Sequence, residues 1–156
     1  MNPPLRSRED KEALIKGIAD GTIDMIATDH APHSKEEKSK GLKDSLMGIS
    51  GIETAFSVLY TSLVKNGVIS LERLIALLSD NPSKRFKIPG GLKVGKAANL
   101  TVFDLNEKYK IDSREFLSKG KSTPFDGKEV FGRCLMTISD GKIAYIREGK
   151  SETRNI

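Results

Sequence analysis

The sequence predicts an α/β fold in which helices and a buried strand are followed by an antiparallel β module. Residues 8–20 carry apolar side chains at helical spacing, and residues 23–28 (IDMIAT) form a short apolar run typical of a buried strand. A helix followed directly by a strand is the repeating step of an α/β architecture. Residues 98–105, 130–138 and 142–146 are β-branched or aromatic runs, which we assign to antiparallel strands.

Local signals fix several of these elements. Ser7 is a plausible N-cap for the first helix, and Asp10 stands three residues on, where a capping box has its acidic residue. Asp140 and Gly141, between the last two strands, are a strong signal for a two-residue hairpin. Residues 34–48 are highly charged and lack periodicity, which is typical of a functional lid or a disordered segment.

Two further helices are predicted in the middle of the chain. Apolar residues recur on one face of residues 49–65, and Asn66–Gly67 ends that pattern. Ser70 then caps a second apolar helix, which Asn81–Pro82 ends or bends into a final short turn.

Composition excludes some classes of protein. The 156 residues are 37% hydrophobic and 30% charged, which is ordinary for a globular protein. No apolar run approaches the roughly 18 residues of a membrane span, and the charged N-terminal stretch does not resemble a signal peptide. The net charge of +5 is spread among acidic residues, so we expect no nucleic-acid partner. A single cysteine suits a reducing cytoplasm, which is the expected location.

The most informative segment is residues 29–33 (DHAPH), directly after the predicted strand. An Asp at that position can ligate a metal or take a proton from metal-bound water, whereas its ordinary structural role would be a helix N-cap or a salt bridge. His30 and His33 are separated by Pro32 and cannot share a regular helical turn, so joint metal ligation is disfavoured. One of them could bind an anionic group while the other braces the site, and the alternative is a surface or packed histidine.

Two other segments could contribute to binding. The backbone N–H groups of Met47 and Gly48 precede a predicted helix and could receive a carboxylate, although from the residues alone ordinary loop glycines are the favoured explanation. Asn2 lies in the stiff segment NPPLR, which could hold an amide side chain for hydrogen bonding or could simply be a chain terminus.

Three motifs together resemble the dihydroorotases of the amidohydrolase superfamily, in the longer type I branch: NPPLR (2–6), DGTIDMIATDHAPH (20–33) and LMGISGIET (46–54). Residues 79–89, 91–105 and 122–143 resemble the same family. The resemblance implies the C-terminal part of a (β/α)₈ metal-dependent hydrolase barrel in residues 1–90. It also implies β-strands of a composite β-sandwich domain in residues 91–156.

The resemblance also implies a function and its residues. Dihydroorotases interconvert N-carbamoyl-L-aspartate and L-dihydroorotate in pyrimidine biosynthesis, with one or two Zn²⁺ ions per complete active site. Asp29 matches the aspartate that binds the metal and transfers the proton, and His33 matches the histidine that contacts the substrate carboxylate. Asn2 and the backbone of Met47–Gly48 match substrate contacts, and His30 is assigned a supporting role.

The remaining metal ligands of the family, an HxH motif, a bridging acid or modified lysine and two further histidines, have no counterpart here. A catalytic zinc needs about three protein ligands, and this chain offers one convincing candidate. A barrel of about 250 residues also exceeds the chain. We therefore expect a C-terminal portion of a dihydroorotase that binds zinc weakly by itself and is inactive alone.

Other functions remain open at the level of sequence. The chain could be a non-catalytic interaction protein that packs on aspartate carbamoyltransferase or on a complete dihydroorotase, and a homodimer is a further expectation. It could also belong to another cyclic-amide hydrolase, such as an allantoinase or a dihydropyrimidinase. In the enzymatic cases the partner is a small-molecule substrate.

Overall fold

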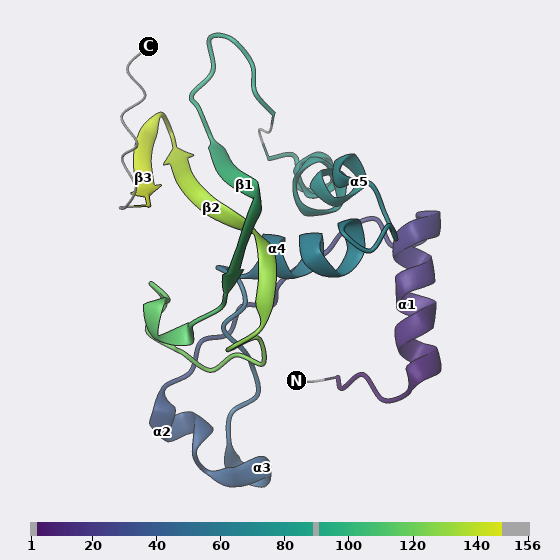
Figure 1. The fold of residues 1–156 in the computed structure, drawn as a ribbon, viewed down its shortest axis with the longest axis vertical. Coiled ribbons are helices and arrows are strands. Elements are labelled where there is room, and N and C mark those ends of the chain that lie inside the picture. The colour runs from purple at the N-terminus through teal and green to yellow at the C-terminus, as the bar shows by residue number, and fades with distance from the viewer. Residues whose placement is uncertain (1–2, 89–90, 148–156) are drawn as a thin grey trace.

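The computed structural model describes residues 3–88 and 91–147, with a sheet on one side, α1 on the other and α4 between them (Figure 1). The elements in chain order are α1 (Arg8–Asp20), α2 (Lys35–Lys38), α3 (Gly41–Asp44), α4 (Ala55–Leu59), η1 (Tyr60–Val64), α5 (Leu71–Ile75), η2 (Ala76–Asp80), α6 (Asn81–Phe86), β1 (Leu100–Lys110), η3 (Ser113–Glu115), β2 (Glu129–Ser139) and β3 (Lys142–Ile146). Over the described ranges, no helix is long and apolar enough to cross a membrane.

Helix α1 has the predicted ends. The Ser7 hydroxyl accepts the Asp10 backbone N–H at 3.1 Å, and the Asp10 carboxylate accepts the Ser7 N–H at 3.1 Å, which completes the capping box. Gly21 ends the helix with a φ of 93°, a left-handed conformation that glycine adopts without steric cost. The apolar face is only partly covered, because Leu14 is 48% exposed.

The middle helices also form, with π-helical turns in both. The helix predicted over residues 49–65 begins later, at α4, and continues into the π-helical η1. Ser70 caps α5 by accepting the Arg73 N–H at 3.1 Å, as predicted. The short helix α6 follows η2 directly and has Pro82 in its first turn, where a proline is tolerated, which matches the predicted final short turn.

The charged segment of residues 34–48 forms two short helices. Ser34 and Glu37 make a second capping box, in which the Glu37 N–H is 3.2 Å from the Ser34 hydroxyl. Lys38 then donates to the carbonyls of Leu46 and Gly48 at 2.8 and 3.0 Å and closes the loop. The segment is therefore ordered by local caps rather than disordered, and a role as a lid stays a prediction.

The predicted antiparallel module is a three-stranded sheet in the order β1-β2-β3. Asp140 and Gly141 have φ values of 48° and 75°, as a type I′ hairpin turn requires. Strand β1 extends to Lys110, five residues beyond the predicted end. The Asp104 carboxylate accepts the N–H groups of Asn106 and Glu107 at 2.8 and 3.1 Å, so the strand passes through a bulge and pairs again at Lys108.

The core lies between the helices and the sheet. Its buried members are Tyr60, Leu63, Ile69, Leu74 and Leu77. Phe56 of α4 stacks on Phe103 of β1 with ring centroids 3.9 Å apart. Gly132 of β2 allows the close approach, since a Cβ there would lie 3.0 Å from the Phe56 ring. The Ser57 hydroxyl donates to the Gly132 carbonyl at 2.6 Å and fixes α4 to β2.

Leu77→Ala is expected to lower the free energy of unfolding by about 2–5 kcal/mol, because Leu77 is fully buried and the surrounding helices cannot close the cavity. Leu42→Ala is the matched control, with an expected change within about 0.5 kcal/mol because the Leu42 side chain is fully exposed. Urea denaturation of both variants measures the difference. Equal midpoints would contradict this description of the core.

Candidate functional site

The segment that leads into the site is not a strand. Residues 23–28 pair with no strand of the described ranges, so the prediction of a β-strand here is wrong. A strand needs a neighbour to receive its backbone hydrogen bonds. Here the Ile26 N–H donates to the Leu77 carbonyl at 3.1 Å, and His30 makes a single parallel bridge with Ile49.

Asp29 lies at the end of this segment in an unusual conformation. Its φ is 45°, in the left-handed region that few non-glycine residues occupy, and the residue is exposed. Over residues 3–88 and 91–147 its carboxylate forms no hydrogen bond and no ion pair. It therefore fills neither of the structural roles considered for it, and its oxygens are available to a ligand.

The structure brings His33 together with Met47 and Gly48. The Nε2 atom of His33 lies 2.9 Å from the Met47 carbonyl oxygen, and since a carbonyl only accepts, Nε2 carries the hydrogen. The Nδ1 atom is 3.6 Å from a Glu37 carboxylate oxygen, longer than a hydrogen bond. A hydrogen bond from the Ser34 backbone N–H lowers the pKa of Glu37, which keeps a negative charge beside this ring.

Gly48 allows this arrangement. Its φ is 136°, and a Cβ there would lie 2.6 Å from the Ala31 Cβ and 3.1 Å from the His33 Nε2. Only glycine permits the two loops to approach this closely. Among the described residues, the N–H groups of Met47 and Gly48 donate no hydrogen bond, so they can still receive a ligand. Asn2 lies outside the described residues.

His30 faces the start of the helical region. Its Nδ1 atom accepts the backbone N–H groups of Gly51 and Ile52 at 3.2 and 3.4 Å. The ring therefore connects the loop of Asp29 to the loop of residues 47–52, which agrees with a supporting position. The two histidines face different partners and do not converge on one point.

A loop of the β module, residues 116–122, packs against the candidate site, and sequence reasoning did not predict this contact. The Ser50 hydroxyl, 2% exposed, donates to the Gly120 carbonyl at 2.6 Å, and the Ser50 N–H donates to the Ser122 carbonyl at 2.8 Å. Gly120 packs on the backbone of His33, since a Cβ there would lie 2.8 Å from the His33 N. These contacts join residues about 70 to 90 positions apart, so no local pattern could have revealed them.

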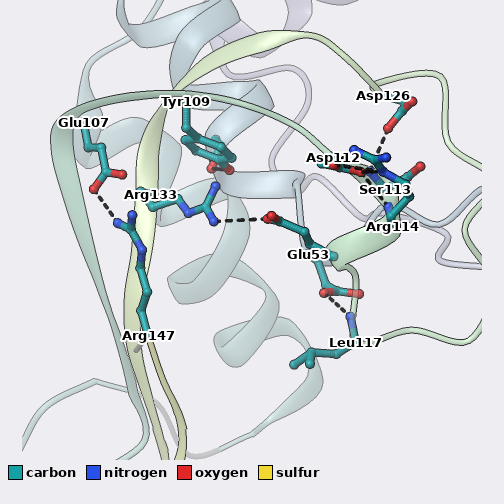
Figure 2. A network of polar contacts seen from close by, with 12 residues as sticks. Glu53, Glu107, Tyr109, Asp112, Ser113, Arg114, Leu117, Asp126, Arg133 and Arg147 are labelled. Carbon is teal, nitrogen blue, oxygen red and sulfur yellow. Dashed lines mark hydrogen bonds and ion pairs between the residues drawn. The ribbon is translucent and has the colours of Figure 1, made fainter. Parts of the chain in front are cut away.

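Figure 2 shows the polar network beside this loop. The Glu53 carboxylate accepts the N–H groups of Leu117 and Ser118 at 2.8 and 2.9 Å. The Arg133 guanidinium lies 4.2 Å from the centre of the Tyr109 ring, and burial raises the pKa of Tyr109. Glu53 therefore ties the loop of residues 116–122 to the segment just before α4.

At the edge of the same network, further hydrogen bonds hold the turn of η3 before the loop. The Asp126 carboxylate accepts the Ser113 N–H at 2.7 Å. Hydrogen bonds from the Arg114 side chain lower the pKa of Asp112 to about 2.

The groove beside His33 is basic. It has a volume of about 410 Å³ and is lined by His33, Ser34, Lys35, Lys38, Ser39, Lys119, Lys121 and Ser122. Four lysines and no acidic residue give it a positive potential that attracts anions. The groove lining does not include Asp29, Met47 or Gly48. The candidate site therefore has three separate features: an Asp29 carboxylate without a partner in the described ranges, unpaired backbone N–H groups at Met47 and Gly48, and positive charge in the groove beside His33.

The described residues hold no group of three or more side chains able to bind a metal ion. Asp29 fits as one ligand because its carboxylate is exposed and has no partner in the described ranges. The other ligands that a catalytic metal needs must lie elsewhere.

Comparison with known proteins shows the family. A model of the amidohydrolase family matches residues 2–144, and the chain belongs to this family. It is 55% identical over 149 residues to the dihydroorotase of Bacillus cytotoxicus and 56% identical to that of Bacillus cereus (strain B4264). Each alignment covers 95% of this chain but 35% of the relative, so the chain spans about a third of the length of these curated relatives.

Solved structures give the same assignment. An L-hydantoinase (dihydropyrimidinase) from Arthrobacter aurescens matches 92% of this chain and 33% of its own, with 36% identity and a TM-score of 0.83. A D-hydantoinase (dihydropyrimidinase) from Thermus sp. matches 96% of this chain and 34% of its own, with 31% identity and a TM-score of 0.84. The chain therefore has an amidohydrolase fold of mixed helix and strand content with an antiparallel sheet.

Gly120→Ala is expected to lower stability by about 1–3 kcal/mol and to shift the NMR signals of the His33 ring, because the added methyl group has no space against the His33 backbone. Gly51→Ala is the matched control, since a Cβ there meets no atom closer than 3.8 Å. Unchanged His33 signals in Gly120→Ala would contradict a role for the β module in placing this histidine.

Proposed function

We propose that the chain forms the C-terminal part of a dihydroorotase, which interconverts N-carbamoyl-L-aspartate and L-dihydroorotate. The observation that carries the proposal is the sequence identity of 55% over nearly the whole chain to dihydroorotases. The Met47–Gly48 N–H groups and the basic groove beside His33 support it, because both reactants are anions, and the Asp29 carboxylate has no partner in the described ranges.

For the architecture, we propose that residues 1–90 belong to a (β/α)₈ barrel and residues 91–156 to a composite β-sandwich. The isolated segment of residues 23–28 would be a barrel strand whose neighbours lie outside this chain. Its position before Asp29 supports this assignment, since functional groups gather at the carboxyl ends of barrel strands.

The proposed residue roles follow from what each group can do. Asp29 would contribute one metal ligand and move the proton at its carboxylate, accepting it during ring opening and donating it during ring closure. The metal, which we expect to be Zn²⁺, supplies Lewis-acid chemistry when bound. The remaining ligands would come from outside the described residues.

The binding roles are proposed for four positions. His33 would contact the substrate carboxylate. Because Nε2 already donates to the Met47 carbonyl, a contact through Nδ1 requires that Nδ1 also carries a hydrogen. The N–H groups of Met47 and Gly48 would donate to the substrate, and Asn2 would add a hydrogen bond from its amide. His30 would not touch the substrate.

A second function is favoured by the solved structures. Hydantoinases and dihydropyrimidinases superpose on this chain with TM-scores of 0.83 and 0.84. Allantoinase chemistry is a related alternative. A panel of dihydroorotate, hydantoin, dihydrouracil and allantoin, given to the complete enzyme, separates these activities, and we expect turnover of dihydroorotate alone.

Association with a second copy or with aspartate carbamoyltransferase is part of the proposal, and a purely non-catalytic interaction role is its alternative. Size-exclusion chromatography of the chain with each candidate partner tests association. Elution as separate species would count against it.

The 156-residue chain by itself, supplied with Zn²⁺, is expected to show no turnover of dihydroorotate, because its described residues offer a single metal ligand where about three are needed. A coupled spectrophotometric assay of both reaction directions measures this. Turnover at the rate of a full-length dihydroorotase would overturn the ligand argument.

Asp29→Asn is expected to lower kcat by about 10²–10⁴-fold in a chimera that joins this chain to the N-terminal two thirds of the Bacillus cytotoxicus dihydroorotase. The substitution removes the proton-transfer group and weakens a metal ligand. Asp24→Asn is the matched control, because Asp24 is an exposed aspartate of the same segment. Full activity of the Asp29→Asn chimera would contradict the proposed role.

A further inference from the structure

We propose that His30 is a positioning residue, fixed as the neutral tautomer with its proton on Nε2, that links the loop of Asp29 to the loop of residues 47–52. Its importance for catalysis rests on the proposed function, whereas its tautomer and its contacts do not.

The tautomer follows from the partners of the ring. The Nδ1 atom accepts two backbone N–H groups, from Gly51 at 3.2 Å and from Ile52 at 3.4 Å. A nitrogen that accepts hydrogen bonds carries no proton, so the proton of the neutral ring is on Nε2. Backbone N–H groups cannot reverse their role, so for this orientation of the ring the assignment does not depend on the rotation of any hydroxyl or amide group.

This tautomer excludes His30 as a metal ligand. A histidine that binds a metal through Nε2 donates its Nδ1–H to an acceptor, and here Nδ1 faces two donors. Ligation through Nδ1 would displace both of those N–H groups. His33 also reaches this loop, as a donor to the Met47 carbonyl, whereas His30 is the residue of the motif whose ring accepts backbone N–H groups from it.

The task of His30 is to hold two loops in register. The backbone reinforces the contact, because His30 forms the parallel bridge with Ile49 and the Ala31 N–H donates to the Ile49 carbonyl at 3.0 Å. Asp29, directly before His30, has a φ of 45°, a conformation that persists only where neighbours hold it. The ring and the bridge together hold Asp29 at a fixed place relative to the Met47–Gly48 N–H groups.

The test uses the 156-residue chain and requires no activity. The chain contains only two histidines, so their ring nitrogens give two separate sets of signals in a nitrogen-15 NMR spectrum. His30 is expected to show an unprotonated Nδ1 and a protonated Nε2. A protonated Nδ1 on His30 would overturn the proposal.

Hydrogen exchange tests the linkage. His30→Ala is expected to speed exchange of the Gly51 and Ile52 amides about fivefold or more, the factor for loss of one ordinary hydrogen bond. His30→Asn is expected to restore slow exchange, because the Asn side-chain oxygen can accept in place of Nδ1. His33→Ala is the matched control and should leave both amides unchanged.

The outcomes separate this inference from the proposed function. If exchange in His30→Ala equals that of the unsubstituted chain, His30 links nothing and the inference fails, whatever the enzyme does. If His30→Ala unfolds the chain, His30→Asn and the tautomer in the unsubstituted chain still decide the question. A chimera without dihydroorotase activity would refute the proposed function and leave the tautomer result standing.

Discussion

The buried Ser50 holds together three segments that are distant in sequence. Its hydroxyl and its N–H both donate to carbonyls of the loop in the β module, at 2.6 and 2.8 Å. Gly120 of that loop lies on the backbone of His33. Gly51, directly after Ser50, is the first of the two residues whose backbone N–H groups donate to the His30 ring. Because the DHAPH loop has no sheet to anchor it within the described residues, its geometry depends on these few contacts.

This dependence explains why the β module matters for the site beyond the two groove lysines, Lys119 and Lys121, that it contributes. Glu53 binds the backbone of Leu117 and Ser118, and the Ser57 hydroxyl joins α4 to β2. The residues around the start of α4 therefore contact the candidate site on one side and the sheet on the other. A distortion of the sheet would reach the site through residues 50–57 without changing any group that meets a ligand.

Elements governed by neighbouring residues could be predicted from the sequence, and elements governed by distant residues could not. The capping box of Ser7 and Asp10 and the Asp140–Gly141 turn are complete within a few positions, and both form as expected. The apolar run of residues 23–28 shows that a segment is suited to a strand, but pairing requires a neighbour, which the described residues lack. In the site, the motif gave Asp29, His30 and His33, whereas Ser50 and Gly120 carry no chemical signature and became visible only when the chain was folded.

The π-helical turns of η1 and η2 have a consequence for chain length. In η1 the Lys65 N–H bonds to the Tyr60 carbonyl, five residues back, at 2.9 Å, so this turn contains one residue more than an α-helical turn. Deleting one residue there would restore the α-helical register and rotate everything that follows by about 100° about the helix axis. The number of residues in this turn, as well as their identity, therefore determines which side chains after it face the sheet.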